Sequence, residues 1–221
     1  MDANTQLKGI RFSGENVQVS VYDELTSLNQ QGKFLKDRCT EYRRELRRAV
    51  NMSLDSFLKG EIYPEDVVLS VRRQDFDNER DKKKSTTLKA ACPAAVLKER
   101  GYADEVENQI EEYNSLVCMD FHGPEKLDWI KETLAGLPYV YYAGISSGKT
   151  GVFAVIPIVS TDWREHTRYF DELEHVTRQL GLNPSKKGRL VTDLRYQSID
   201  RDAYFNLDCT RFSLVRPGEE Q

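Results

Sequence analysis

Hydrophobic and polar positions from residue 115 onward follow the pattern of short strands and amphipathic helices in a regular order. The run SLVCMD has the length and composition of a buried strand. The runs PYVYYAG and VFAVIPI predict two more strands, joined by the tight turn SSGKTG. The run RLVTDLRYQS predicts a last strand, which closes the series.

Two amphipathic helices separate these strands. In PEKLDWIKETLAG, Ile130 and Leu134 share one face, Pro124 suits the first turn and Gly136 marks the end. In TDWREHTRYFDELEHVTRQLG, apolar residues again share a face and Gly181 is the C-terminal stop. The order βαββαβ predicts an α+β protein with a ferredoxin-like, RRM-like core of four strands packed on two helices.

The first half of the chain has a different pattern. Two short strands are predicted within residues 5–23, where valines alternate with polar residues. A long amphipathic helix is predicted from Leu35 to Phe57, because apolar residues recur there at helical spacing. Residues 1–113 are therefore expected to form an α+β accessory module. It would pack against a core of residues 114–221 and form one compact unit with it.

Two of three charged stretches admit both a structural and a functional interpretation. The arginine-rich face of the helix predicted before residue 57 is typical of a solvated face with ion pairs, or of a helix that follows phosphates. Residues 72–88 are the most polar stretch and predict a mobile loop, whose lysines at 82–84 are either solvated or in contact with nucleic acid. Residues 104–112 are acidic and predict a plain surface.

Composition narrows the class of protein. The 221 residues carry 32 Lys and Arg against 36 Asp and Glu, so any phosphate-binding surface has to be a local patch of positive charge. The four cysteines are far apart, which predicts reduced thiols rather than a zinc or disulfide framework. No secretory signal and no apolar run of membrane-spanning length is visible, so a soluble, cytoplasmic protein with no membrane partner is expected.

The segment AGISSGKT, from Ala143 to Thr150, has the spacing of a phosphate-binding P-loop apart from its first alanine. A P-loop needs a helix N-terminus after it, so that backbone N–H groups and the helix dipole meet the phosphates. Here β-branched residues and Pro157 follow, which predict a strand. The segment is therefore expected to be a hairpin turn, whose amides, serines and Lys149 are still available to an anion.

Two side-chain clusters are candidates for chemistry. Asp120 and His122 are two residues apart at the end of a strand, so they share a face and can hold one divalent metal ion. The alternative is that Asp120 caps the helix that follows. A basic cluster near the last predicted strand offers phosphate contacts, although a strand arginine pairs as readily with a carboxylate. Its members are Lys186, Lys187, Arg189, Arg195 and Ser198.

The segment from Leu88 to Asn206 resembles the N-terminal domain of virulence-associated protein E-like primase–helicase proteins of bacterial mobile elements. That family is similar to the archaeal–eukaryotic primase superfamily, also called primase-polymerases. The matching pieces are LKAACPAAVLKERG, EYNSLVCMDFHG, LPYVYYAGISSGKTGVFAVIPI, WREHTRYFDELEHVTRQLGL and LRYQSIDRDAYFN. Residues 1–87 match only loosely.

The resemblance implies a nucleotidyltransferase core in which carboxylates hold two Mg²⁺ or Mn²⁺ ions. The first expected acid is Asp120, but His122 stands at the position of the second and Asn183 at that of the third. Loss of two carboxylates weakens a site for a hard cation, so the resemblance implies a divergent primase with weakened or no activity. The positions that match the family's nucleotide-binding residues are Ser147, Gly148, Lys149, Arg195, Ser198 and Asp200, with Arg189 nearby.

The resemblance also implies partners. A primase-polymerase-like domain of a DNA replication protein binds nucleotides or single-stranded DNA and works with a helicase domain or protein of the same system. The alternative hypothesis is a non-catalytic module that only binds nucleic acid or a protein.

Overall fold

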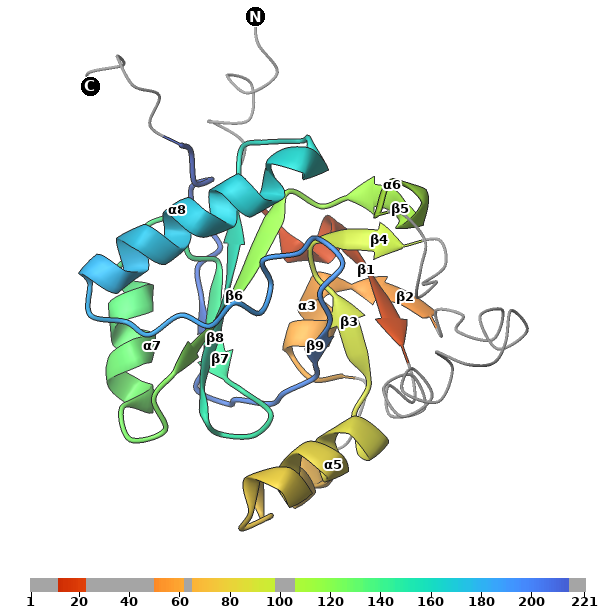
Figure 1. Ribbon diagram of the computed structural model, residues 1–221, viewed down its shortest axis with the longest axis vertical. Coiled ribbons are helices and arrows are strands. Elements are labelled where there is room, and N and C mark those ends of the chain that lie inside the picture. Colours follow the sequence, from red (N-terminus) through yellow and green to blue (C-terminus); the bar gives the residue numbers. More distant parts are fainter. Residues whose placement is uncertain (1–11, 23–49, 62–64, 98–105, 215–221) are drawn as a thin grey trace, which may run out of the picture.

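Short runs of apolar residues pair into two four-stranded antiparallel sheets in the computed structural model, which describes residues 12–22, 50–61, 65–97 and 106–214 (Figure 1). The core sheet has the order β10-β7-β8-β6, with β6 Leu116–His122, β7 Tyr142–Ile145, β8 Gly151–Pro157 and β10 Tyr204–Phe205. The accessory sheet has the order β2-β1-β3-β9, with β1 Gln18–Tyr22, β2 Val50–Ser53, β3 Ala90–Cys92 and β9 Arg195–Tyr196. A two-stranded ladder pairs β4 Ala95–Leu97 with β5 Ile110–Tyr113. The predicted α+β class is confirmed.

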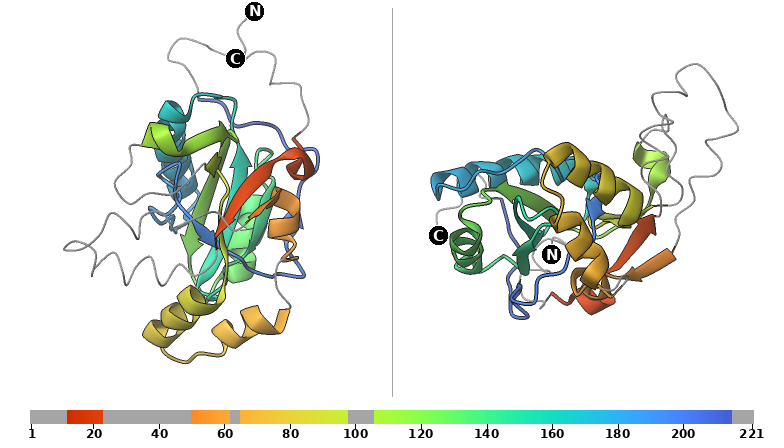
Figure 2. Two further views of the ribbon diagram at one scale, coloured as in Figure 1. Left: turned by 90° about the vertical axis from the view of Figure 1, so that its right-hand side faces the viewer. Right: turned by 90° about the horizontal axis from the view of Figure 1, so that it is seen from below.

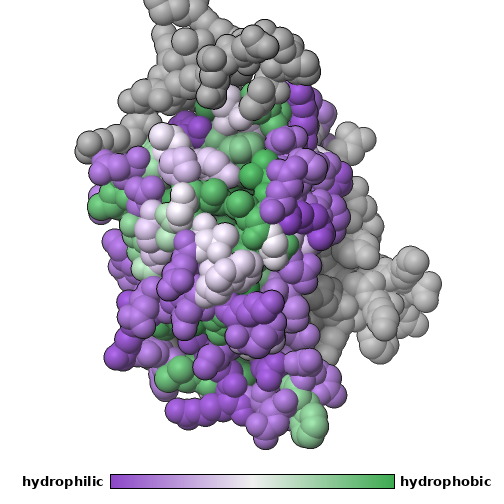
Figure 3. Space-filling model, turned by 90° about the vertical axis from the view of Figure 1, so that its left-hand side faces the viewer, coloured by the Kyte–Doolittle hydropathy of each residue, from purple (hydrophilic) through white to green (hydrophobic). Residues whose placement is uncertain are grey.

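Two amphipathic helices cover one face of the core sheet. They are α7 Leu127–Ala135 and α8 His166–Gln179, the latter after a 3₁₀ turn at Trp163–Glu165. Ile130 and Leu134 of α7 and Phe170 of α8 are buried in one cluster with alternate residues of β6 and β8. The polar faces of such helices remain in solvent, and the side of the molecule where they lie is mostly hydrophilic, with hydrophobic residues mainly in its upper half (Figure 3). Both predicted helices are confirmed.

The accessory sheet packs against the opposite face of the core sheet. Val19 and Val21 of β1 share a hydrophobic cluster with Cys118 of β6 and Phe153 of β8. A 3₁₀ turn at Gly14–Asn16 and α3 Leu54–Leu58 flank this contact, and α3 adds Leu54 and Phe57 to the cluster. The order of layers is therefore helices, core sheet, accessory sheet.

The predicted long helix is wrong over residues 50–53 and correct over residues 54–57, the part of it that the structure describes. Residues 50–53 form strand β2, which pairs with β1 from Gln18↔Ser53 to Val21↔Val50, and only the short α3 follows. The Ser53 side chain accepts a hydrogen bond from the amide of Ser56 and so caps the start of α3. Most of the predicted helix, and the first of the two strands predicted within residues 5–23, lie outside the described residues.

The polar stretch 72–88, predicted as a loop, is largely helical. It contains α5 Asp77–Thr87, which follows α4 Glu65–Arg72 and lies beside it below the sheets (Figure 2). Helix α5 has no apolar face to reveal it, but i,i+3 ion pairs stabilise it, between Arg80 and Asp77 and between Lys84 and Asp81, each at 2.5 Å. The acidic segment 104–112 is described from residue 106, where it contains the short α6 Val106–Gln109 and most of β5, with Glu107, Glu111 and Glu112 exposed as predicted.

The predicted last strand is also wrong in extent and in partner. Only Arg195 and Tyr196 are extended, as β9, and they pair with β3 of the accessory sheet. The preceding residues form turns because the Asp193 carboxylate accepts hydrogen bonds from the amides of Gly188 and Leu190, at 2.9 and 3.1 Å. At the edge of the core sheet formed by β6, where the last strand was predicted, a single antiparallel bridge joins Phe121 to Pro184.

The sequence also predicted reduced thiols and no membrane-spanning segment. Cys92, Cys118 and Cys209 are free and buried, and Cys39 lies outside the described residues. No helix among the described segments is both long enough and apolar enough to cross a membrane.

His166 at the start of α8 is buried and satisfied as a neutral imidazole, 1% exposed. Its Nε2 donates to the carbonyl of Gly188 at 2.9 Å, and its Nδ1 accepts from the hydroxyl of Tyr113 at 3.0 Å. Burial lowers its pKa below the ordinary value of 6.5. His122 and His175 are exposed.

This histidine predicts a pH dependence of stability. As the pH falls below 6.5, the unfolded chain takes up a proton at residue 166 that the folded protein does not, so the free energy of unfolding falls. The expected contribution is at most about 1.4 kcal/mol per pH unit. Urea unfolding at several pH values should show a shallower dependence for His166→Gln than for the wild type. His175→Gln, at an exposed site, should keep the wild-type slope, and equal slopes in all three proteins would contradict the prediction.

Candidate functional site

The side chains of β6 alternate between the two faces of the core sheet. Val117, Met119 and Phe121 point into the cluster beneath α7 and α8. Asp120 and His122 therefore lie on the opposite face, in line with Cys118. The accessory sheet covers Cys118 but not the end of the strand, so the side chains of Asp120 and His122 line a cavity. Strand periodicity predicted that these two side chains share a face.

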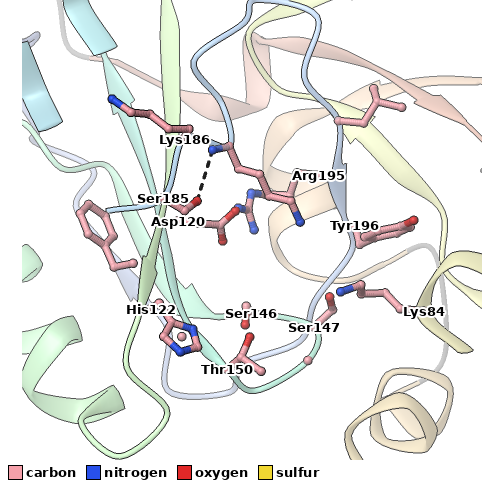
Figure 4. Close-up of a pocket in the computed structure, with 15 residues that line it drawn as sticks. Lys84, Asp120, His122, Ser146, Ser147, Thr150, Ser185, Lys186, Arg195 and Tyr196 are labelled. Atoms are coloured by element: carbon pink, nitrogen blue, oxygen red, sulfur yellow. Dashed lines mark hydrogen bonds and ion pairs between the residues drawn. The ribbon is translucent and has the colours of Figure 1, made fainter. Parts of the chain in front are cut away.

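This cavity, of about 440 Å³, is formed by four segments that are far apart in the sequence (Figure 4). They are the end of β6, the turn between β7 and β8, the segment that follows α8, and β9, with α5 at the rim. The lining residues with polar side chains are Lys84, Asp120, His122, Ser146, Ser147, Thr150, Ser185, Lys186, Lys187, Arg195 and Tyr196.

Asp120 forms an ion pair with Arg195, whose side chain is only 10% exposed. The guanidinium also donates from Nε to the sulfur of Cys118 at 3.1 Å and lies 4.3 Å from the ring centroid of Phe153. Burial disfavours the charge of Arg195, but Asp120 and Cys118 more than offset this and hold its pKa above the ordinary value. Arg195 is therefore a fixed cation, and the carboxylate of Asp120 is already balanced by it.

Three lysines add positive charge around this pair. Lys84 pairs with Asp81 and lies 5.5 Å from the ring centroid of Tyr196, and Lys186 pairs with Glu174. Lys187 forms no ion pair with any residue of the described segments. The cavity lining thus has four cationic side chains and one carboxylate. Asp81 and Glu174, which do not line the cavity, balance Lys84 and Lys186, and Lys187 leaves an excess of positive charge that attracts anions.

The turn between β7 and β8 is a tight hairpin, held by hydrogen bonds from Ser146 N to Gly151 O and from Lys149 N to Ser146 O, both at 2.9 Å. Because β8 begins at Gly151, no helix follows the turn, and the P-loop interpretation is excluded. Ser147 and Gly148 line the cavity, whereas Lys149 is exposed and does not.

Arg72 of α4 anchors this turn to the segment after β9. Its Nη2 donates to the carbonyls of Ser146 and Ile199 and to the hydroxyl of Ser198, at 3.4, 2.6 and 3.1 Å. Ser198 is buried and in turn donates to the carbonyl of Ile145 at 2.6 Å. Ser198 therefore holds the turn in place and does not line the cavity.

The remaining candidate residues lie outside the cavity. Asn183 is exposed, and only its backbone carbonyl takes part, as acceptor for the amide of His122 at 3.0 Å. Arg189 forms a bidentate pair with Asp171 at 2.7 and 2.8 Å. Asp200 accepts from the amide of Ile145 at 2.9 Å and pairs with Lys131. Of the predicted site residues, the structure brings together Asp120, His122, Ser147, Gly148 and Arg195 with the lysines at 186 and 187.

Sequence reasoning did not assign Lys84, Tyr196 or Ser185 to the site. Lys84 belongs to the lysine triplet, for which contact with nucleic acid was one of two interpretations, and Tyr196 is the neighbour of Arg195. Their position follows from the docking of α5 and from the pairing of β9 with β3. Ser185 gave no signal in the sequence, because its place depends on the hydrogen bond from its amide to the carbonyl of Asp120 at 2.8 Å.

The residues present do not fit a pair of Mg²⁺ ions. Within the described segments no three His, Cys, Asp or Glu side chains come together as a ligand set. Asp120 and His122 are the only such groups that line the cavity, and the carboxylate already pairs with Arg195. Mg²⁺ prefers several oxygen ligands with negative charge, which this cavity lacks.

Comparison with known proteins gives one family. The family described as BT4734-like, N-terminal domain, matches residues 83–205, which span the core sheet, both of its helices and every segment that lines the cavity. No curated protein and no solved structure matches the chain.

Proposed function

The chain belongs to the family of BT4734-like N-terminal domains, and we propose that its cavity binds the phosphates of a nucleotide or of a single-stranded nucleic acid. The observation that carries the proposal is the charge of the cavity, in which Lys84, Lys186, Lys187 and Arg195 surround one carboxylate. Hydroxyl groups of the hairpin turn add neutral donors to this set. Tyr196 at the rim adds an aromatic surface on which a base can stack.

The topology supports a ferredoxin-like, RRM-like core as part of the proposal. Strands β6, β7 and β8 with α7 and α8 have the order βαββα, and β8 lies between the other two strands. In such a core the fourth strand lies antiparallel beside the first. The antiparallel bridge between Phe121 and Pro184 is at that edge, so the fourth strand is reduced to a single bridge here. The cavity opens on the sheet face opposite the two helices.

Within this proposal the protein is a primase-polymerase-like domain of a mobile-element replication system, acting with a helicase in the bacterial cytoplasm. The free, buried thiols of Cys92, Cys118 and Cys209 suit a reducing compartment. The proposal assigns the cavity to binding and not to nucleotide transfer, because Asp120 is paired with Arg195 and the residue two positions later is His122.

Binding to a single-stranded oligonucleotide is expected to weaken as salt rises, because each phosphate contact releases counterions. About three phosphate contacts give a slope near −2 in a plot of log affinity against log salt concentration. Fluorescence anisotropy with a labelled homothymidine strand measures this, with ATP as a competitor. Binding that does not depend on salt, or no binding at low salt, would overturn the proposal in favour of a module that docks onto a protein.

A primer-synthesis assay with Mn²⁺, nucleotides and a single-stranded template tests whether the cavity binds without transferring nucleotides. We expect no product above that of Asp120→Ala, since one carboxylate and one imidazole are too few ligands for two metal ions. Primer synthesis by the wild type that Asp120→Ala abolishes would show a working nucleotidyltransferase and contradict this expectation.

A further inference from the structure

We propose that Arg195 takes the place that a divalent metal ion has in a nucleotidyltransferase, so that the cavity binds phosphates without a divalent cation. This inference rests on the proposed function and says how the same site holds its ligand.

The position of the Arg195 guanidinium supports this role. It sits against the Oδ2 atom of the Asp120 carboxylate at the end of β6, at a place that a metal bound by that oxygen would occupy (Figure 4). It is held there by the Cys118 sulfur at 3.1 Å and by the ring of Phe153 at 4.3 Å. A guanidinium keeps its charge at every pH the protein meets. The positive charge at this point is therefore built into the chain.

Arg195 also retains hydrogen-bond donors that its described contacts do not use. A guanidinium has five N–H groups in a planar fork, and the described contacts use Nε and Nη2 only. Nη1 has no hydrogen-bond partner in the described part of the chain, and Arg195 lines the cavity. A phosphate oxygen can thus accept from Arg195 while Asp120 keeps its ion pair. A hydrogen bond from the charged guanidinium to a phosphate oxygen is also stronger than one between neutral groups.

A divalent ion at the same point would carry an electrostatic cost. Such an ion would share one carboxylate with Arg195 and lie within the field of Lys186 and Lys187. His122, the other possible ligand, is neutral when it binds a metal and adds no negative charge. Like charges repel most strongly where the surroundings are partly shielded from water, and Arg195 is only 10% exposed.

The decisive experiment is isothermal titration of the full chain with ATP, once in EDTA and once each in MgCl₂ and MnCl₂. We expect ATP to bind in EDTA at least as tightly as with either metal. Metal ions neutralise part of the triphosphate charge, so affinity in MgCl₂ should fall by about two- to fivefold.

Asp120→Asn distinguishes a carboxylate that only pairs with Arg195 from a carboxylate that binds a metal ion. If Arg195 is the phosphate ligand, the substitution removes a like charge beside the phosphate and should raise affinity by about three- to tenfold. If Asp120 were a metal ligand, the same substitution would abolish binding that depends on metal. Asp128→Asn on α7 is the matched control, because Asp128 is exposed and does not line the cavity, and it should leave affinity unchanged.

The outcomes separate this inference from the proposed function. Binding that is at least about tenfold tighter with Mg²⁺ or Mn²⁺ than in EDTA would overturn the inference and leave the proposed function standing. No binding of ATP or of an oligonucleotide in any buffer would overturn both. The comparison of ATP affinity in the three buffers uses the wild type alone, so it tests the inference even if Asp120→Asn does not fold.

Discussion

Gly188→Ala is expected to lower the free energy of unfolding by about 4 kcal/mol or more, which would leave little folded protein at 37 °C. Gly188 has a φ of +90°, and a Cβ at this residue would lie 1.8 Å from the carbonyl oxygen of Cys118 in β6. The contact is with the backbone of β6, which pairs with β8 along its whole length, so nothing flexible can move aside. The carbonyl of Gly188 also accepts the hydrogen bond from His166, which the displaced chain would lose.

Two matched glycine substitutions distinguish the steric clash with β6 from backbone strain as the cause of this loss. Urea unfolding of each variant measures the free energy of unfolding. Gly181→Ala has a comparable φ of +80° but meets only the ring of Trp129 at 3.6 Å, so it should cost about 1 kcal/mol for backbone strain alone. Gly136→Ala, at a φ of −71° with its nearest contact at 3.4 Å, should change stability little. A loss for Gly188→Ala no larger than that for Gly181→Ala would contradict the close approach of this segment to β6.

The double substitution Lys186→Glu with Lys187→Glu is expected to weaken binding of a single-stranded oligonucleotide by about a hundredfold or more at low salt. Both lysines lie on the segment that crosses the edge of β6 and line the cavity. The change replaces two attractive charges with two repulsive ones next to the bound phosphates. Both side chains are exposed, so the thermal stability should fall only modestly through the lost ion pair between Lys186 and Glu174.

The control for this experiment is Arg164→Glu with Arg168→Glu near the start of α8. It changes the net charge of the protein by the same amount, but neither arginine lines the cavity. Fluorescence anisotropy should therefore give nearly wild-type affinity for the control. An equal loss in both double variants would mean that overall charge, and not this cavity, governs binding.

The sequence predicted strands β6, β7 and β8 of the core sheet and both of its helices because their signals are local. β6 and β8 are short apolar runs of strand length, and in α7 and α8 the apolar residues follow the helical period, so each element is visible in its own residues. Strand parity also placed Asp120 and His122 on one face before any fold was known. These inferences need no information about distant parts of the chain.

The predictions failed where long-range pairing or exposed charge decides the structure. Residues 50–53 became a strand because β1 pairs with them, although their apolar spacing also suits a helix. Helix α5 was missed because its stability comes from ion pairs and not from an apolar face. The last predicted strand joined the accessory sheet, since Asp193 turns the chain before β9 begins.

By itself, the sequence determined an α+β protein with a βαββα run, a hairpin in place of a P-loop, and a carboxylate and an imidazole at the end of one strand. Only the tertiary structure decided what faces that carboxylate. The pairing of β9 with β3 brings Arg195 onto Asp120, and the docking of α5 brings Lys84 to the rim. These neighbours come from segments far apart in the chain. Their meeting depends on sheet register and packing, which no local pattern of residues encodes.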